Sequence, residues 1–339
     1  MDLATSWLGK APQLRDIDAP SDRINLDYPP SFAKDFNLNP IHAVQNLMTS
    51  QKYQPLENPY VLSPFLFYCP NLTPIAITQF FFANRTEAHS YFYFFFSAPI
   101  LDFLSLADAA RILLSRIAFP ENPDLFQLII NSFVDAYCNS NQYISESRDD
   151  IFKLVIAAII LSMSRRQNEI ISQASFLNMI TKVKSSKEFK INYYETLKSH
   201  PIPLFFTFWH YNKDPETQKS GLLRKAGGIF KKKSKKFFII KQNELQWYKD
   251  PSMKEISGGF DINFTSTVFV PSNGKDPAHI VIKRHDNEPF GYSINKSQKK
   301  LRKNSSYNYS SNKEEETKQW VGVLNFIAFN LLLHSIISS

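Results

Sequence analysis

The sequence predicts a multidomain α and β protein: an all-α domain of stacked helices, followed by a sheet of seven strands that ends in a helix. Three observations lead to this fold class. Apolar residues recur at helical spacing from residue 32 to about residue 205. Three short apolar or aromatic runs between residues 219 and 250 are separated by turn residues, as in a β-meander. Positive charge is concentrated in this second part of the chain.

Composition divides the chain into four segments. Residues 1–31 are rich in Asp, Pro and Ser, and we expect a mobile lead-in. Residues 32–205 form the helical domain, residues 206–218 a linker, and residues 219–339 the sheet with its terminal helix. A chain of 339 residues that is 43% apolar is long enough for two separate cores.

The helical domain opens at Phe36–Pro40, which caps a helix that runs to Met48. Seven further helices are expected at 74–84, 87–96, 106–118, 124–138, 149–164, 172–183 and 189–199. The aromatic run from Tyr91 to Phe96 could be a binding platform, but such runs are more often core, and we adopt that interpretation.

The strands are expected at 222–223, 237–240, 245–248, 256–270, 279–283, 289–294 and 307–310. A helix follows, because an acidic first turn at 314–316 precedes Trp320, Leu324 and Ile327 at helical spacing. The apolar stretch 321–337 has 17 residues and contains three polar ones, Asn325, Asn330 and His334. It is at the lower limit for a membrane span, so a helix packed on the domains is preferred to a tail anchor.

Charge separates the two halves. Residues 213–303 hold 20 Lys and Arg against 9 Asp and Glu, a net +11, whereas the remainder has 19 against 22, a net −3. Five lysines (231, 232, 233, 235 and 236) lie at the end of the first turn. Their crowding is either a solvated basic turn or an anion site. A basic β-rich domain fits anionic lipids better than a nucleic acid, which we consider an unlikely partner.

Several function classes are excluded by what the sequence lacks. Cys69 and Cys138 are too few for a disulfide framework, and Met1–Arg15 has no apolar signal region, so a cytoplasmic location is expected. The histidines are scattered without metal-ligand spacing, and there is no Gly-rich phosphate loop. We therefore expect no metal and no cofactor, and no chemical catalysis.

The β-rich half resembles a pleckstrin homology domain, a seven-stranded barrel plugged by a helix that carries a Trp. The resemblance rests on Gly221-x-Leu223-x-Lys225, on Lys235-Lys236-Phe237-Phe238-x-Ile240, on Leu245–Tyr248 and on Trp320. It implies that Lys225 and Lys236 hold the phosphates of a phosphoinositide. The middle basic position of the family falls on Ser234, and Lys233 or Lys235 would substitute for it.

The helical half resembles the Arf exchange domain, the Sec-seven domain of the cytohesins and their relatives. The matching residues are Phe36-Asn37-x-x-Pro40, Leu106–Arg111, Phe119–Asn122, Phe133–Tyr137, Asp149, Ile159–Leu161 and Phe176. In that family an exchange domain directly followed by a pleckstrin homology domain is a known arrangement. The resemblance implies an Arf-family small GTPase as partner.

Two family signatures are altered here. The family's Pro-Gly-Glu loop, whose Glu enters the nucleotide site of the GTPase, becomes Pro120-Glu121-Asn122. A neutral amide cannot repel a β-phosphate, so the remaining candidate is Glu121. The second signature, which lines the groove for the GTPase, corresponds to Leu161–Gln167 and keeps only the Leu. By resemblance the GTPase-binding residues are Leu161, Ser162, Met163, Ser164 and Arg166.

The leading hypothesis is a regulator of an Arf-family GTPase, peripherally recruited to membranes in vesicle trafficking, with guanine-nucleotide exchange weakened or lost by Asn122. The alternative is a scaffold without exchange activity that uses the same fold to bind a GTPase or another partner at phosphoinositide membranes. The two differ in whether a carboxylate reaches the nucleotide.

Overall fold

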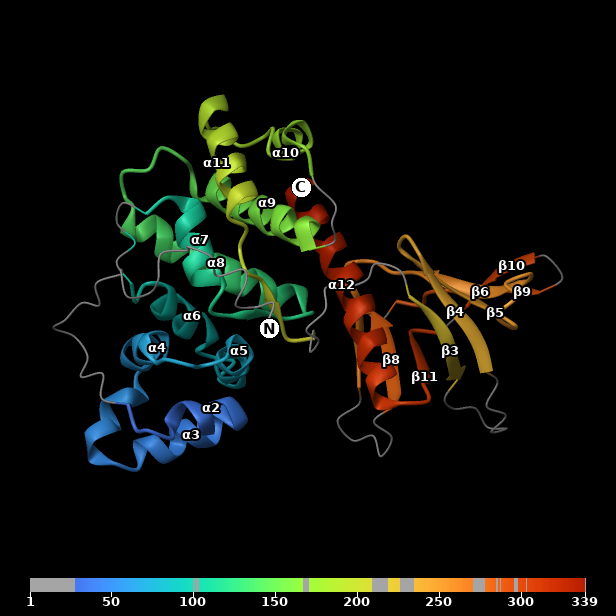
Figure 1. The fold of residues 1–339 in the computed structure, drawn as a ribbon, viewed down its shortest axis with the longest axis horizontal. Helices are drawn as coiled ribbons and strands as arrows, with labels where there is room; N and C mark the ends of the chain where they lie inside the picture. The colour runs from blue at the N-terminus through green and yellow to red at the C-terminus, as the bar shows by residue number, and fades with distance from the viewer. Residues whose placement is uncertain are drawn as a thin grey trace. The chain divides into compact units, whose positions relative to one another are not determined.

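The computed structural model describes residues 28–99, 101, 104–166, 171–208, 219–225, 235–270, 278–284, 286, 288–295, 298–302 and 304–338. The chain divides into two compact units, which we call the helical unit (Met1–Pro120 and Asp124–Thr207) and the C-terminal unit (Phe208–Ser339, to which Glu121–Pro123 is also assigned) (Figure 1). Most of the predicted lead-in and of the predicted linker lies outside the described residues.

The helical unit consists of helices of 7 to 19 residues with one small pair of strands. The helices are α2 (Phe32–Leu38), α3 (Pro40–Met48), the 3-10 helix η2 (Gln51–Glu57), α4 (Pro59–Tyr68), α5 (Pro74–Ala83), α6 (Ala88–Phe96), α7 (Leu106–Leu114), α8 (Pro123–Ser140), α9 (Arg148–Arg166), α10 (Gln173–Met179) and α11 (Lys187–Ser199). The strands β1 (Ala118–Phe119) and β2 (Phe205–Phe206) pair in parallel.

The start of α3, α4 and α5 is encoded in the same way. Each helix begins at a proline, and the preceding Asn39, Asn58 or Thr73 accepts a hydrogen bond from a backbone N–H of the first turn. Proline suits the first helical position because that position needs no N–H donor. The N-cap side chain satisfies one of the N–H groups that the helix leaves without a partner.

Asn37, from the sequence motif at the start of this unit, joins two elements. Its amide donates to Asn71 O at 2.8 Å and accepts from Thr73 N at 2.8 Å. Asn37 therefore holds the turn before α5 against the end of α2, which gives the motif a structural role.

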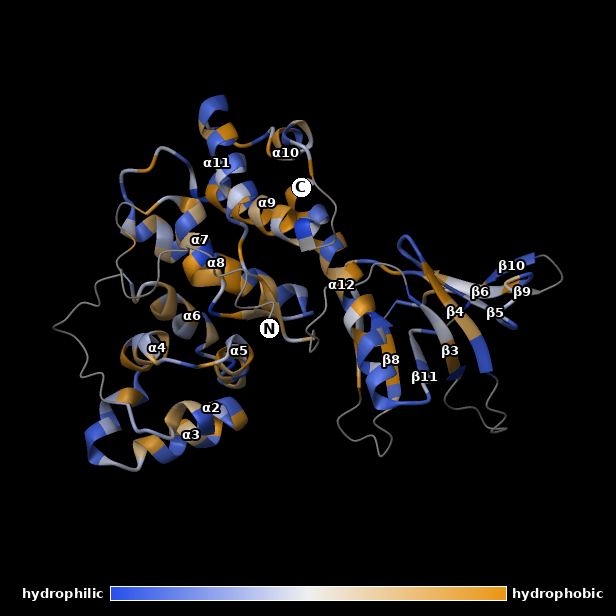
Figure 2. Cartoon of the chain, viewed as in Figure 1, coloured by the Kyte–Doolittle hydropathy of each residue, from blue (hydrophilic) through white to orange (hydrophobic). Residues whose placement is uncertain are grey.

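Aromatic side chains fill much of the helical core. Within α6, Tyr91, Phe92, Phe95 and Phe96 are buried. Phe96 meets Phe133 of α8 edge-to-face, with ring centroids 5.8 Å apart, and Figure 2 shows hydrophobic residues along α8 and α9. These four aromatic residues are core, as predicted, whereas Tyr93 and Phe94 are half-buried.

The C-terminal unit is built on one sheet of nine described strands. They are β3 (Ser220–Lys225), β4 (Lys235–Lys241), β5 (Glu244–Tyr248), β6 (Ile256–Asp261), β7 (Ser266–Phe269), β8 (His279–Arg284), β9 (Tyr292–Asn295), β10 (Gln298–Leu301) and β11 (Ser306–Ser310). Their order in the sheet is β10-β9-β6-β5-β4-β3-β11-β8-β7, and every pairing is antiparallel.

The predicted fold class is confirmed, but the predicted number of strands is wrong. The single run expected at 256–270 is two strands, because Asn263 accepts hydrogen bonds from Thr265 N and Ser266 Oγ and turns the chain between β6 and β7. The second additional strand is β10, whose four side chains are all exposed.

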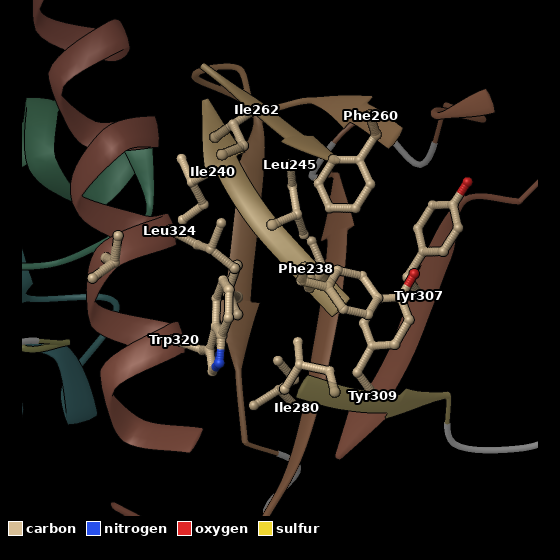
Figure 3. Packing of buried hydrophobic residues seen from close by; sticks show 14 of the residues in the cluster. Phe238, Ile240, Leu245, Phe260, Ile262, Ile280, Tyr307, Tyr309, Trp320 and Leu324 are labelled. Carbon is tan, nitrogen blue, oxygen red and sulfur yellow. The ribbon is translucent and has the colours of Figure 1, made fainter. Parts of the chain in front are cut away.

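The last helix, α12 (Glu314–Ser338), closes one side of this core. Trp320 and Leu324 point from α12 toward the sheet, where they pack with Ile240, Ile280 and other buried residues (Figure 3). Trp320 has no exposed surface, as predicted for the plug of the barrel.

Asn325 lies on the face of α12 that meets the edge strand β7. Its side chain accepts from Val268 N at 2.8 Å and donates to Val268 O at 2.7 Å, and all these atoms are buried. An edge strand exposes N–H and C=O groups that need partners. Asn325 therefore serves one residue of β7 as a neighbouring strand would.

Replacing Asn325 by leucine, which has a similar volume, should lower the free energy of unfolding by about 2 kcal/mol. Two buried backbone groups of Val268 would lose their partners. Urea denaturation followed by circular dichroism measures this change. The matched control is Asn330→Leu, because Asn330 is half-buried on the same helix. Equal stability of the two variants would contradict the role assigned to Asn325.

Among the residues that the structure describes, α12 alone has the length and composition of a membrane-spanning helix. Within its most apolar window, 61% is buried. This burial and the hydrogen bonds of Asn325 favour the packed-helix interpretation over a tail anchor.

Candidate functional site

The loop predicted to face the nucleotide lies between β1 and α8. Phe119 ends β1 and is fully buried, and Pro123 begins α8. Phe119 O accepts from Thr207 N at 2.9 Å, and the Phe119 ring meets Phe126 edge-to-face with centroids 5.4 Å apart. Because both ends of the loop are fixed and the loop is short, the backbone at Glu121 and Asn122 has little room to move.

Asn122 occupies the position just before α8. The pair Asn122-Pro123 repeats the pattern of Asn39-Pro40 and Asn58-Pro59, in which the asparagine caps the helix. The pattern places Asn122 at the N-cap of α8, where a side-chain oxygen is useful and a negative charge is not required. This offers a structural reason for an amide where the related family has a Glu.

Glu121 lies one residue further from α8. It is the only carboxylate between β1 and Asp124 of the first helical turn. Its side chain is half-buried.

The second predicted segment forms the last turns of α9. Leu161, Ser162, Met163 and Ser164 are 1–7% exposed. Ser162 Oγ donates to Ala158 O at 2.8 Å and accepts from Ile202 N at 3.0 Å. Arg166 is the last residue of α9, and its side chain lies outside the described atoms. Ser162 is thus engaged inside the helical unit, where it holds the chain that leads to β2.

The segment 198–206 connects the two predicted site segments. Arg165 of α9 donates to Lys198 O. Arg111 of α7, 6% exposed, donates to His200 O through Nε at 3.1 Å and Nη2 at 3.0 Å, and its Nη1 lies 2.6 Å from Asp108. The segment then pairs with β1 through β2. Its position therefore sets the start of the 120–122 loop. Sequence reasoning did not identify Arg111 and Arg165 in this role, because both bonds reach backbone atoms far along the chain.

In the C-terminal unit the predicted lipid-binding lysines come from two paired strands. Lys225 ends β3 and Lys235 begins β4, and the register pairs Arg224 with Lys235. Lys235 is exposed and Lys236 is half-buried. The sheet brings the three backbone positions to one end. Lys233 lies outside the described residues.

Two further lysines lie at this end of the sheet. Strand β5 runs antiparallel to β4, so the loop that follows Tyr248 returns to the end where β4 begins. Lys249 and Lys254 of this loop are exposed, and Lys249 pairs with Glu255. We call Lys225, Lys235, Lys236, Lys249 and Lys254 the lysine end of the sheet. In the sequence, Lys249 directly follows the strand predicted at 245–248, and this position was the signal that could have placed it at an end of the sheet.

Comparison with known proteins finds a matching domain family for each of the two units. The family model described as Sec7 domain matches residues 30–202, just over half of the chain, and the model described as PH domain matches residues 217–328. The chain belongs to the Sec7 domain family. The pleckstrin homology match covers all nine strands and ends within α12, which continues to Ser338.

Similar curated proteins include cytohesin-3 of Rattus norvegicus, 23% identical over 238 residues, and cytohesin-2 of Homo sapiens, 22% identical over 239 residues. Each alignment covers 66% of this chain and 58% of the relative, so the chain spans little more than half of their length.

Solved structures similar to this member of the Sec7 domain family include the Sec7p catalytic domain, with 15% identity, a TM-score of 0.44, and coverage of 52% of this chain and 98% of that one. Another is a point mutant of Legionella pneumophila RalF, with 13% identity, a TM-score of 0.45, and coverage of 84% of this chain and 85% of that one.

Proposed function

We propose that this protein regulates guanine-nucleotide exchange on an Arf-family small GTPase at membranes that contain anionic lipids. The observation that carries the proposal is the order of the two matched domains, a Sec7 domain followed by a PH domain. It is supported by the loop held between β1 and α8 and by the lysine end of the sheet. The protein is proposed to be cytoplasmic and peripherally recruited.

Exchange would act through like charge. Two unit charges 4 Å apart repel by about 4 kcal/mol at an effective dielectric constant of about 20. A carboxylate brought this close to the β-phosphate of bound GDP would weaken nucleotide binding considerably. Asn122 has no charge, so the proposal assigns this role to Glu121 and predicts an exchange rate below that of a member with the family's Glu.

Release of fluorescent GDP from a panel of Arf-family GTPases tests the proposal. Full-length protein should accelerate release from at least one of them, and more so when vesicles with phosphoinositide are present. If no GTPase releases its nucleotide faster, but one binds in a pull-down, the scaffold alternative replaces exchange. If none binds, the GTPase proposal is wrong.

The lysine end should contribute directly to lipid binding. Lys225→Ala combined with Lys236→Ala should reduce affinity for phosphoinositide vesicles about thirtyfold, because each lysine near an anionic surface contributes about 1 kcal/mol. Sedimentation with vesicles measures the affinity, which should also fall with added salt. The control is Lys241→Ala at the opposite end of β4, which is exposed. Unchanged binding by the double variant would refute the assignment of these two residues.

A further inference from the structure

The helical unit carries a basic surface of its own between α10 and α11. Lys182, Lys184, Lys187 and Lys190, here called the α10–α11 lysine cluster, fall within nine residues, and Glu188 is the one acidic residue among them. Lys182, Lys184 and Lys187 are exposed, and Lys190 is half-buried. Outside residues 213–303 the chain is net negative, so the cluster is a local exception.

The backbone under the cluster is held at several points. Ile180 and Val183 are 1% and 3% exposed and anchor the connection in the core. Lys184 N donates to Asp150 Oδ1 at 3.1 Å, and Asp150 is itself 5% exposed and accepts from Ser147 Oγ at 2.8 Å. The lysines are therefore presented from a fixed segment.

The bonds to Asp150 keep its carboxylate charged. Burial of Asp150 disfavours the charged form, but hydrogen bonds from the Ser147 hydroxyl and from the backbone N–H groups of Lys184 and Ser147 outweigh this effect, and the pKa is lowered. The anchor of the segment thus remains intact at neutral pH.

The start of α11 adds to the positive potential. Ser186 caps the helix by accepting from Phe189 N at 3.1 Å, and the N-terminal end of a helix of 13 residues carries a partial positive charge. Ammonium groups at this density create a positive potential, to which an anionic surface is attracted.

The chemistry of the cluster favours a lipid surface over a nucleic acid. Its cations are lysines, which act as point charges and lack the planar fork with which Arg recognises single phosphates. The nearby ring of Phe189 is stacked on Tyr193, with centroids 5.9 Å apart and planes 9° apart, so that face cannot stack on a base. Diffuse attraction to acidic headgroups needs neither feature.

We propose that the α10–α11 lysine cluster is a second contact with an anionic bilayer, made by the helical unit itself. The inference rests on the proposed membrane recruitment of the chain by its C-terminal unit. Once one unit is bound, the second contact forms at high effective concentration, so modest individual affinities combine into a much higher one. The contact also keeps the Sec7 domain at the bilayer surface.

The test compares full-length variants on vesicles of phosphatidylcholine and phosphatidylserine, with and without a phosphoinositide. Lys182→Gln, Lys184→Gln and Lys187→Gln together should reduce binding to phosphatidylserine vesicles at least tenfold. The ratio of affinities with and without phosphoinositide should stay the same, because the lysine end is unchanged. The control carries Lys34→Gln, Lys52→Gln and Lys198→Gln, which remove the same charge from exposed positions elsewhere on the helical unit.

A triple Lys→Arg variant separates charge from folding, since it should bind as the wild type does. Equal vesicle binding by wild type and the Gln triple variant would overturn the inference. A Gln triple variant that loses binding to duplex RNA but binds vesicles as the wild type does would overturn it as well. In a further outcome, wild-type binding does not depend on phosphoinositide, but the Gln triple variant loses binding to phosphatidylserine vesicles. This outcome would support the inference and refute the phosphoinositide part of the proposed function.

Discussion

Replacing Trp320 by alanine should lower the free energy of unfolding of the C-terminal unit by about 3–5 kcal/mol, the usual loss for a fully buried Trp. Trp320 has no exposed surface and lies within the core cluster between α12 and the sheet (Figure 3). A Cβ atom at Gly221 of β3 would be only 3.6 Å from the Trp320 ring, so the ring lies against the strand backbone. The cavity left by alanine could not close without moving β3.

Urea denaturation followed by far-ultraviolet circular dichroism measures this effect without relying on the fluorescence of the removed residue. Lys318→Ala is the matched control, because Lys318 is exposed on the same helix and pairs with Glu314 at 2.8 Å. An exposed pair of this kind contributes at most about 1 kcal/mol. If Trp320→Ala unfolded at the same urea concentration as the control, the helix would not plug this core.

The sequence predicted most helices because their apolar positions recur with a helical period. It missed α4, in which Pro64 lies inside the helix and five of the ten residues are buried. A helix that is apolar on most sides has no clear period, and an internal proline is normally read as an end. It missed β10 for the opposite reason, since four exposed residues show no alternation.

Polar residues were harder to interpret than apolar ones. Asn325 was read as an interruption of an apolar helix, whereas its side chain satisfies Val268, 57 residues away. Ser162 was assigned to a GTPase-binding groove by resemblance, and its hydroxyl meets Ile202 N, 40 residues away. Long-range hydrogen bonds of this kind have no local signal in a single sequence.

The position of the candidate loop followed from the sequence, but the local role of Asn122 did not. The resemblance compared Asn122 with a Glu and registered a lost charge. The structure adds that Asn122 directly precedes α8 in a pattern used to cap α3 and α4. Local helix capping and nucleotide expulsion thus make different demands on the same position.

The second large prediction concerns a variant in which position 122 regains the family's charge and gives up the asparagine. In a chain that carries Glu121→Gly and Asn122→Glu, GDP release from a docked Arf-family GTPase should be roughly 100-fold faster, which is the usual effect of one well-placed charge in a poorly solvated site. The glycine restores the freedom of the turn, and the glutamate restores the charge at the family's position. Loss of the cap that the Asn-Pro pattern assigns to Asn122 should cost about 1 kcal/mol. A carboxylate near the start of α8 offsets part of that cost through the helix dipole.

Two further variants separate the two carboxylate positions. Glu121→Gly alone removes the only carboxylate of the wild-type loop, so it should abolish the residual exchange that we assign to Glu121. Glu121→Gly with Asn122→Gln keeps the glycine and the side-chain length but no charge, and it should be equally inactive. Fluorescent GDP release at saturating GTPase measures all three, and a pull-down shows whether the GTPase docks. Docking without any gain in the Asn122→Glu chain would mean that the carboxylate does not reach the nucleotide, because the backbone fixed between β1 and α8 holds it away, and the scaffold alternative would then describe this protein.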